Sequence, residues 1–285
     1  VNQGFEFMLY STPVQTKDFT FDLNINLSRN VSKVKELADG VDYLFFNGDA
    51  NFPINVGTRV GHRLGEIYAK NLYKRDENGN MIVNKQGRPT KVSGEDAFQY
   101  TLDHPIGNIE PDLLMSVSPS FTYKGFTLSA LFDMKFGGDI VSVSEAMATS
   151  TGLAARTANR GNAENGWKIV APGVTADGTV NSTAMNAQRY YTSMSGMAEE
   201  FVYDASFIKL KELSLGYSFP KSILKKTPLT SLNVAFVARN LAYLMKHTPR
   251  TSPEGGYDTS MFSQAIDYMS VPYTRTFGLS INLGF

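Results

Sequence analysis

Large apolar residues alternate strictly with small uncharged ones along the last stretch of the chain, Arg275 to Phe285. A period of two predicts a β-strand, because successive side chains of a strand point to opposite faces. The apolar face of this strand consists of Phe277, Leu279, Ile281, Leu283 and Phe285. Such a face needs a partner, and two alternatives are open: the lipid around a membrane β-barrel, or the core of a soluble β-protein.

The same alternation runs through Phe19 to Asn30, and a weaker form of it through Gly4 to Val14. The polar residues between them, Gln15 to Asp18, predict a short turn, so the two strands are expected to form a hairpin. The run from Phe19 to Asn30 is longer than the usual globular strand of about 5–6 residues. It matches the roughly 9–11 residues that a tilted strand needs to cross a bilayer, so its length favours the membrane barrel.

A second hairpin is expected where Leu113 to Tyr123 and Phe126 to Phe136 alternate on either side of Lys124-Gly125. A two-residue turn of this kind sets the register of the strands that it joins. Pro119 lies inside the first of these strands and cannot donate a hydrogen bond to a ladder, which predicts a β-bulge at that position.

Phe207 to Phe219 and Ser231 to Leu241 are two more alternating runs, which brings the number of clear strands to seven. The irregular stretch from Val31 to Asn108 raises the number to about nine if it holds two further strands. Within it, Asn78-Gly79 predicts a type I′ hairpin turn, because both central positions of that turn need positive φ. A calcium loop beginning at Asp76 is a weaker alternative, since no glutamate closes it.

Two long polar stretches separate these strands, Gly137 to Ala205 and His247 to Met269. The first is expected to hold a short helix over Ser142 to Ala158. Connections of this length are uncommon in compact domains and are usually binding loops or lids. Short turns at one end of the strands and long loops at the other are typical of outer-membrane barrels, whose long loops are extracellular. Three aromatic residues of the first loop, Trp167, Tyr190 and Tyr191, either contact a ligand or lid or simply pack the loop.

Composition narrows the function classes. The chain has 285 residues, of which 42% are hydrophobic, so it can fold rather than stay disordered. No run of about eighteen apolar residues occurs, which excludes a transmembrane helix but not transmembrane strands. Lysine plus arginine and aspartate plus glutamate both number 27, and this balance argues against a nucleic-acid partner. Cysteine is absent, which removes disulfides and thiolate chemistry.

No catalytic or metal-binding constellation is recognisable in the sequence. His62, His104 and His247 are isolated from one another and from carboxylates at ligand spacing, and no nucleophile elbow or phosphate-binding loop occurs. We therefore expect no metal, no cofactor and no enzymatic activity. Asp133 and Lys135 lie on the polar face of their strand, where they are expected either to pair in a barrel lumen or to contact a ligand.

Several spaced motifs resemble those of the SusC/RagA-type TonB-linked (TonB-dependent) outer-membrane proteins of Bacteroidetes, in their C-terminal barrel segment. They are Ile106 to Asp112, Phe121 to Phe126, Phe136 to Asp139, Asp204 to Pro220, Ala238 to Leu241 and Arg275 to Leu279. Ala238 and Arg239 depart from the residues that are commoner in the family. The motifs occur in the family's order and span most of the chain.

The resemblance implies an all-β fold in which residues 1–285 are the C-terminal portion of a receptor barrel of about 22 antiparallel strands with long extracellular loops. The plug domain and the N-terminal strands are not in this sequence. A terminal strand that ends on phenylalanine is expected to signal to the β-barrel assembly machinery, and its apolar face to meet outer-membrane lipid.

The function implied is that of a nutrient importer in the bacterial cell outer membrane, taking up oligosaccharides or peptides. Its implied partners are a SusD-like surface lipoprotein and, through the missing N-terminal region, TonB. The alternative is a self-contained small outer-membrane β-barrel that acts as an adhesin or an enzyme. A soluble glycan-binding sandwich is a third reading, which would require the apolar faces to meet one another.

Overall fold

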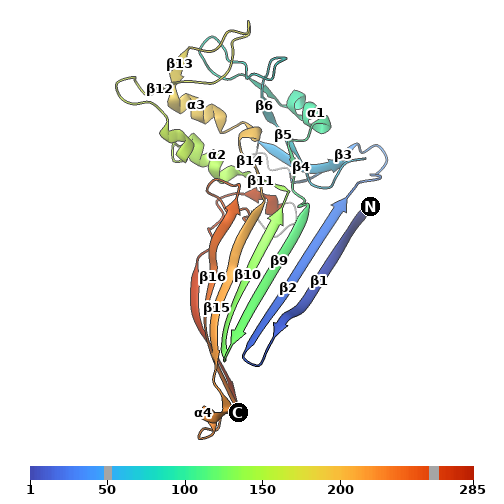
Figure 1. Cartoon of the computed structure of the whole chain (residues 1–285). Helices are drawn as coiled ribbons and strands as arrows, with labels where there is room; N and C mark the ends of the chain where they lie inside the picture. Colours follow the sequence, from blue (N-terminus) through green and yellow to red (C-terminus); the bar gives the residue numbers. More distant parts are fainter. Residues whose placement is uncertain (48–52, 257–262) are drawn as a thin grey trace.

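A seven-stranded antiparallel sheet forms the lower part of the molecule (Figure 1). The computed structural model describes residues 1–47, 53–256 and 263–285. The strands follow the spatial order β1 (Asn2–Gln15), β2 (Phe19–Ser32), β9 (Leu113–Tyr123), β10 (Phe126–Phe136), β15 (Phe207–Ser218), β16 (Ser231–Lys246) and β18 (Thr276–Gly284). These are the seven strands that the alternation predicts, and β16 extends beyond its expected end at Leu241.

Tight turns join the strands at one end of the sheet. In the β1–β2 turn, the Thr16 backbone N–H donates to the Phe19 carbonyl over 2.7 Å. In the β9–β10 turn, Lys124 and Gly125 both have positive φ, at 48° and 88°, as a type I′ turn requires. The β15–β16 connection carries one short helix, α4 (Lys221–Leu224). Both predicted hairpins are therefore confirmed.

Pro119 does not form the predicted bulge. It pairs with Leu23 of β2 in regular register, and the β9–β10 ladder continues past it without a shift. The missing proline N–H interrupts that ladder but inserts no extra residue, so the register survives. Register shifts occur elsewhere in the sheet: between Ser11 and Val14 of β1, and between β15 and both of its neighbours near Lys211. On β16, Asn240 adopts a positive φ of 55° in the same region.

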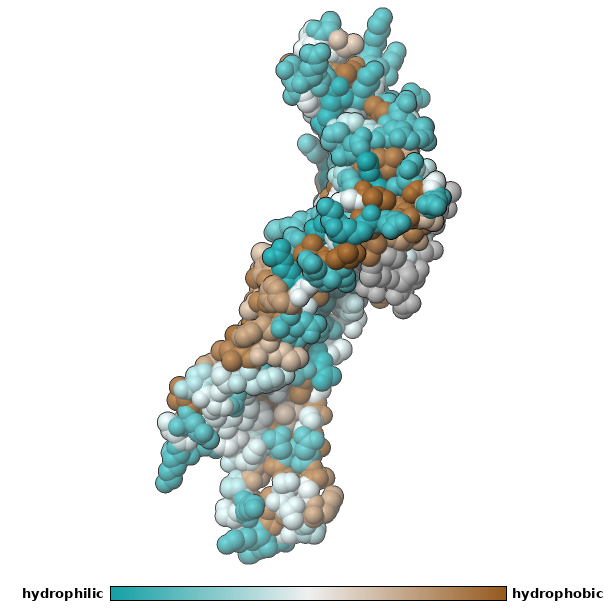
Figure 2. All heavy atoms as spheres, turned by 90° about the vertical axis from the view of Figure 1, so that its right-hand side faces the viewer, coloured by the Kyte–Doolittle hydropathy of each residue, from teal (hydrophilic) through white to brown (hydrophobic). Residues whose placement is uncertain are grey.

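Apolar side chains cover the outward surface of the sheet. On β18, Phe277, Leu279, Ile281 and Leu283 are all at least half exposed, although they are large and apolar. Figure 2 shows hydrophilic residues dominating the upper part of the molecule, while neutral and hydrophobic residues cover much of the sheet below it. The apolar side chains on this face of the sheet stay exposed and do not pack against a second sheet among the described residues, which contradicts a soluble sandwich. No described helix is long and apolar enough to span a membrane.

An outer layer of short elements stands above the sheet (Figure 1). Its strands are β3 (Tyr43–Asn47), β4 (Ile54–Arg59), β5 (Glu66–Ala69), β6 (Asn71–Tyr73), β7 (Lys91–Ser93), β8 (Gly107–Asn108), β11 (Asp139–Ser142), β12 (Lys168–Val170), β13 (Ala184–Asn186), β14 (Val202–Asp204) and β17 (Ile266–Asp267). Its helices are α1 (Glu95–Asp103), α2 (Val143–Ser150), α3 (Ala187–Met194) and the 3₁₀ turns η1 (Ala155–Ala158), η2 (Ala198–Glu200) and η3 (Ser263–Ala265). The predicted short helix is present as α2 and η1.

The stretch expected to be irregular is therefore folded, with two apolar cores of its own. One core joins β4, β5, β11 and β17 around the fully buried Val56, Ile67 and Ile266. The other joins α2, α3 and β13 around Phe201. Residues 257–262, inside the predicted loop from His247 to Met269, lie outside the described residues, as do residues 48–52 of the irregular stretch.

The turn at Asn78-Gly79 exists, but it is not of type I′. Gly79 alone has positive φ, and its N–H donates to the Asp76 carbonyl over 3.0 Å, so a type I turn leads into a left-handed glycine. The Asp76 carboxylate accepts hydrogen bonds from the backbone N–H groups of Asn78 and Asn80. These bonds lower the pKa of Asp76, together with one from the Asn80 side chain, which has the largest effect.

Candidate functional site

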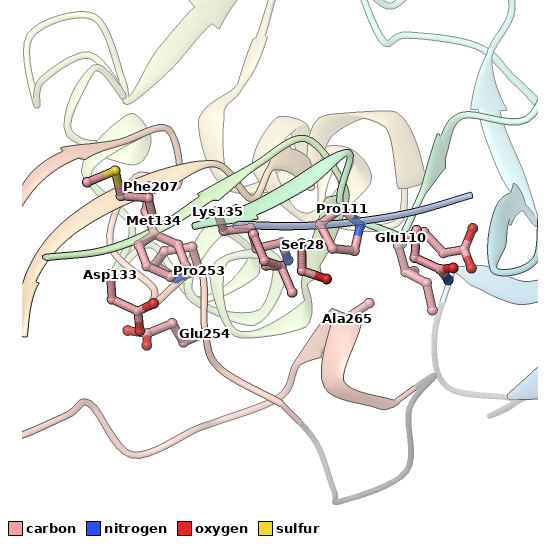
Figure 3. Close-up of a pocket in the computed structure, with 13 residues that line it drawn as sticks. Ser28, Glu110, Pro111, Asp133, Met134, Lys135, Phe207, Pro253, Glu254 and Ala265 are labelled. Carbon is pink, nitrogen blue, oxygen red and sulfur yellow. The ribbon is translucent and has the colours of Figure 1, made fainter. Parts of the chain in front are cut away.

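A cavity of about 530 Å³ lies where the polar face of the sheet meets the outer layer (Figure 3). Strands β2, β9, β10 and β15 supply its wall, and residues of the connection between β16 and β18 supply another side. The close-up shows Asp133 and Glu254 toward one end of the cavity and Glu110 toward the other. The site thus combines three carboxylates and the amine of Lys135 from strands and loops that are distant in sequence.

Strand register explains why these side chains meet. Asp133 of β10 lies opposite Ser116 of β9 and Lys209 of β15. Two residues further on, Lys135 lies opposite Phe207. Because directly opposed residues of antiparallel strands share a face, these residues form adjacent rows on the polar side of the sheet. The predicted location of Asp133 and Lys135 on the polar face agrees with this register.

Lys209 is the most enclosed charge in this region. It is only 3% exposed, and its ammonium group contacts the Glu254 carboxylate over 2.6 Å. The ammonium also lies 5.2 Å from the ring centre of Tyr243 and 4.6 Å from that of Tyr273. The Tyr243 hydroxyl donates a second hydrogen bond to Glu254 over 2.5 Å. A buried charge needs such compensation, and here it attaches the β16–β18 connection to the sheet.

Asp133 does not pair with Lys135. Its carboxylate accepts a 2.6 Å hydrogen bond from the ammonium of Lys211. The register shift at Lys211 explains the difference, because an extra residue in β15 breaks the alternation there. Lys135 lies instead in the electrostatic field of Asp139, Asp204 and Glu254.

The motifs that resemble those of the importer family converge beside this cavity. The Asn108 N–H donates to the Asp139 carboxylate over 2.8 Å, and the Ala205 N–H donates to the Gly138 carbonyl over 2.9 Å. The Gly137 N–H donates to the Ser206 hydroxyl over 2.8 Å. Three segments far apart in sequence therefore form one joint between the sheet and the outer layer.

Two carboxylates of this joint have shifted pKa values. Burial raises the pKa of Asp139. Burial also opposes the ionisation of Asp204, but hydrogen bonds from Ser206 and from the His247 imidazole outweigh it, so the pKa of Asp204 is lowered. The His247 Nδ1 lies 2.5 Å from the Asp204 carboxylate. The two acids, which pair across β11 and β14, thus differ in how readily they ionise.

Non-covalent recognition is the chemistry that this site supports. Its carboxylates are engaged by amines, hydroxyls or backbone N–H groups. Among the described residues, no group of three or more histidine and acidic side chains is arranged to hold a metal ion. The arrangement suits the binding or passage of a polar solute along the sheet.

Trp167, Tyr190 and Tyr191, the three loop aromatics, lie in different environments. Tyr190 and Tyr191 are each 7% exposed and pack against one another in the second apolar core. The Tyr191 hydroxyl donates to the Arg156 carbonyl over 2.9 Å, and burial raises the pKa of Tyr190 to about 12. Their location matches the packing alternative. Trp167 is 49% exposed, so only this ring of the three has an open face.

Comparison with known proteins finds relatives along the whole chain. The TonB-dependent receptor P3 of Formosa agariphila is 27% identical over 302 aligned residues, which cover 100% of this chain and 28% of the relative. The TonB-dependent receptor SusC of Bacteroides thetaiotaomicron is 29% identical over 233 aligned residues, which cover 76% of this chain and 20% of the relative. No protein-family model matches the chain.

Solved structures show the same fold. The RagAB peptide importer in its open-open state superposes with a TM-score of 0.63 at 17% identity, over 100% of this chain and 28% of the matched chain. A second structure, of the RagAB peptide transporter, gives 0.63 at 18% identity over 100% and 29%. The chain spans less than a third of the length of these relatives. The resemblance to a C-terminal barrel segment of SusC/RagA-type proteins is confirmed, since the relatives are TonB-dependent receptors and a peptide importer.

Proposed function

We propose that residues 1–285 form the C-terminal barrel portion of a TonB-dependent importer in the bacterial outer membrane. The observation that carries this proposal is the seven-stranded sheet, in which large apolar side chains lie on one face and mostly small polar side chains lie on the other. That division suits a barrel wall between lipid and an aqueous lumen. The likeness to the TonB-dependent receptor P3, which covers the whole of this chain and 28% of the relative, supports the same assignment.

The edges of the sheet support a larger barrel over a self-contained small one. Within the described residues, β1 and β18 are the two edge strands and are not paired with each other. Every residue of β1 except Ser11 is exposed. Unpaired edges are sites of aggregation unless other strands cover them. We therefore propose that further strands of the whole protein continue the wall on both sides.

The proposed cargo is an oligosaccharide or a peptide, and the proposed partner is a SusD-like surface lipoprotein that docks on the outer layer. TonB would act through the N-terminal region of the whole protein. The assembly machinery would recognise the terminal strand through Phe277, Leu279, Ile281, Leu283 and Phe285. The outer layer supports this arrangement because its two apolar cores make it a preformed surface above the lumen.

The importer function is tested in the bacterium that encodes the protein. A strain lacking the gene is compared with a complemented strain for growth on single oligosaccharides and on peptides, with and without a functional TonB system. We expect the deletion to abolish growth on one nutrient class and affinity purification of the tagged protein to recover a surface lipoprotein. Unchanged growth on every nutrient would contradict the proposed function.

A further inference from the structure

A second cavity, of about 460 Å³, opens in the outer layer. The C-terminal end of α2, the residues around η1, the entry to β12 and the start of α3 surround it. Its lining residues are Thr149, Ser150, Thr151, Gly152, Thr157, Arg160, Trp167, Asn186, Ala187, Gln188 and Tyr191. Hydroxyls, amides, one guanidinium group and one open indole ring thus share a single pocket.

Local hydrogen bonds fix the backbone of the loop that carries the indole ring. Trp167 has positive φ, at 56°, a conformation that is rare for a large side chain. The backbone N–H of Trp167 donates to the Asn162 carbonyl over 2.8 Å, and the Trp167 carbonyl accepts from the Ala187 N–H over 3.0 Å. Asn162 and Asn165 each accept, through their side-chain oxygens, a hydrogen bond from the backbone N–H of the other. The ring is therefore presented by a constrained loop.

Pairing of β12 with β13 attaches this loop to the start of α3. Lys168 lies opposite Asn186, whose side chain caps α3 by accepting from the Arg189 N–H over 3.1 Å. The capping residue and Gln188 are thereby placed beside Trp167 at the rim of the pocket. The Gln188 side chain is exposed and makes no hydrogen bond within the described part of the chain. Its amide is available to a ligand.

The pocket has positive charge and no negative charge among its described lining residues. Arg160 is the only charged residue among the described residues that line it, and its guanidinium donates to the Gly152 carbonyl over 3.2 Å. This single neutral contact leaves most of its donors available. Thr149 also belongs to the lining, but it is fully buried, so the accessible charged and amide side chains of the pocket are those of Arg160, Asn186 and Gln188.

We propose that this pocket binds a sugar ring that carries a carboxylate or sulfate group. This inference rests on the proposed importer function and specifies the cargo class. The apolar face of the ring stacks on Trp167, because an aromatic face desolvates C–H groups at low conformational cost. Arg160 binds the anionic substituent through its planar donors, which match carboxylate and sulfate oxygens. Gln188 and Asn186 receive the ring hydroxyls.

The test uses the full-length protein in detergent on an array of neutral, uronate-bearing and sulfated oligosaccharides. We expect retention of acidic sugars, with one of the two anionic classes preferred. Trp167→Ala should reduce retention of every bound sugar about tenfold, and Trp167→Phe should reduce it less because an aromatic face remains. Arg160→Gln should remove the preference for acidic sugars while neutral sugars bind as before.

Two variants serve as matched controls. Tyr100→Ala removes a 57% exposed ring on α1, and Arg275→Gln removes an exposed guanidinium just before β18. Neither residue lines the pocket, so both variants should bind like the wild type. Failure of the wild type to retain any sugar, or retention unaffected by Trp167→Ala, would overturn the assignment. If Trp167→Ala abolished sugar retention but left nutrient uptake intact, this inference alone would be overturned. Absence of any uptake by the wild type would overturn the importer function.

Discussion

Replacing Lys209 should detach the β16–β18 connection from the polar face of the sheet. Lys209→Met removes the ammonium but keeps most of the apolar stem, and it leaves the Glu254 carboxylate without its counter-ion. Glu254 is 19% exposed and its partner 3% exposed, so the pair is largely shielded from water. Breaking a buried ion pair by removing one partner costs about 3–5 kcal/mol, and we expect about 3 here because Tyr243 still donates to Glu254.

Hydrogen–deuterium exchange of the full-length protein measures this local opening. A loss of about 3 kcal/mol raises amide exchange at residues 248–256 roughly a hundredfold, since about 1.4 kcal/mol corresponds to a factor of ten. Lys211→Met is the control. Its pair with Asp133 joins side chains that are 47% and 27% exposed, so its removal should cost no more than about 1 kcal/mol. Equal exchange in wild type and Lys209→Met would refute the reasoning.

Three further predictions test other parts of the structure. Leu279→Arg places a charge on the proposed lipid face of β18 and should destabilise the barrel in vesicles by about 2–4 kcal/mol, whereas Ser280→Arg on the polar face should cost less; equal costs would contradict the assignment of faces. Gly138→Ala should lower the yield of folded protein on a heat-modifiability gel, because Gly138 has a φ of 74° and an added Cβ would lie 3.0 Å from the Ile109 carbonyl; an unchanged folded band would count against strain at the joint. The pKa of Asp204 is lower in the folded protein than its ordinary value of about 3.9, so its ionised carboxylate stabilises the joint at pH values above about 3.9. This stability is lost as the pH falls through the pKa of the folded state. Amide hydrogen exchange at residues 204–206 should therefore rise in acid relative to neutral pH, and Asp204→Asn should remove this acid-dependent rise.

The strands of the sheet were predictable because their signal is local. A strand with one apolar and one polar face shows its period of two within a few residues, and the Lys124-Gly125 turn sets its own geometry. The glycines and short polar turns that end the runs are equally visible in the sequence. For this reason the number of strands in the sheet and both hairpins were correct.

The outer layer was not predictable in the same way. Its strands are only a few residues long, and the contacts that stabilise them join distant positions. The Tyr73 N–H, for example, donates to the Glu199 carboxylate across 126 positions of sequence. Such short segments carry too few residues for a period to emerge, so their structure depends on the cores that they share.

The sequence by itself determined which face of each sheet strand is apolar, where the tight turns fall and which family the motifs resemble. Only the tertiary structure decided which charges meet. The Asp133–Lys211 pair depends on a bulge, and the Lys209–Glu254 pair depends on a long connection that folds back onto the sheet. The burial of Tyr190 and Tyr191 and the exposure of Trp167 depend likewise on packing between α2 and α3. Alternation along a strand is a property of neighbouring residues, whereas pairing and burial depend on segments that become neighbours only when the chain has folded.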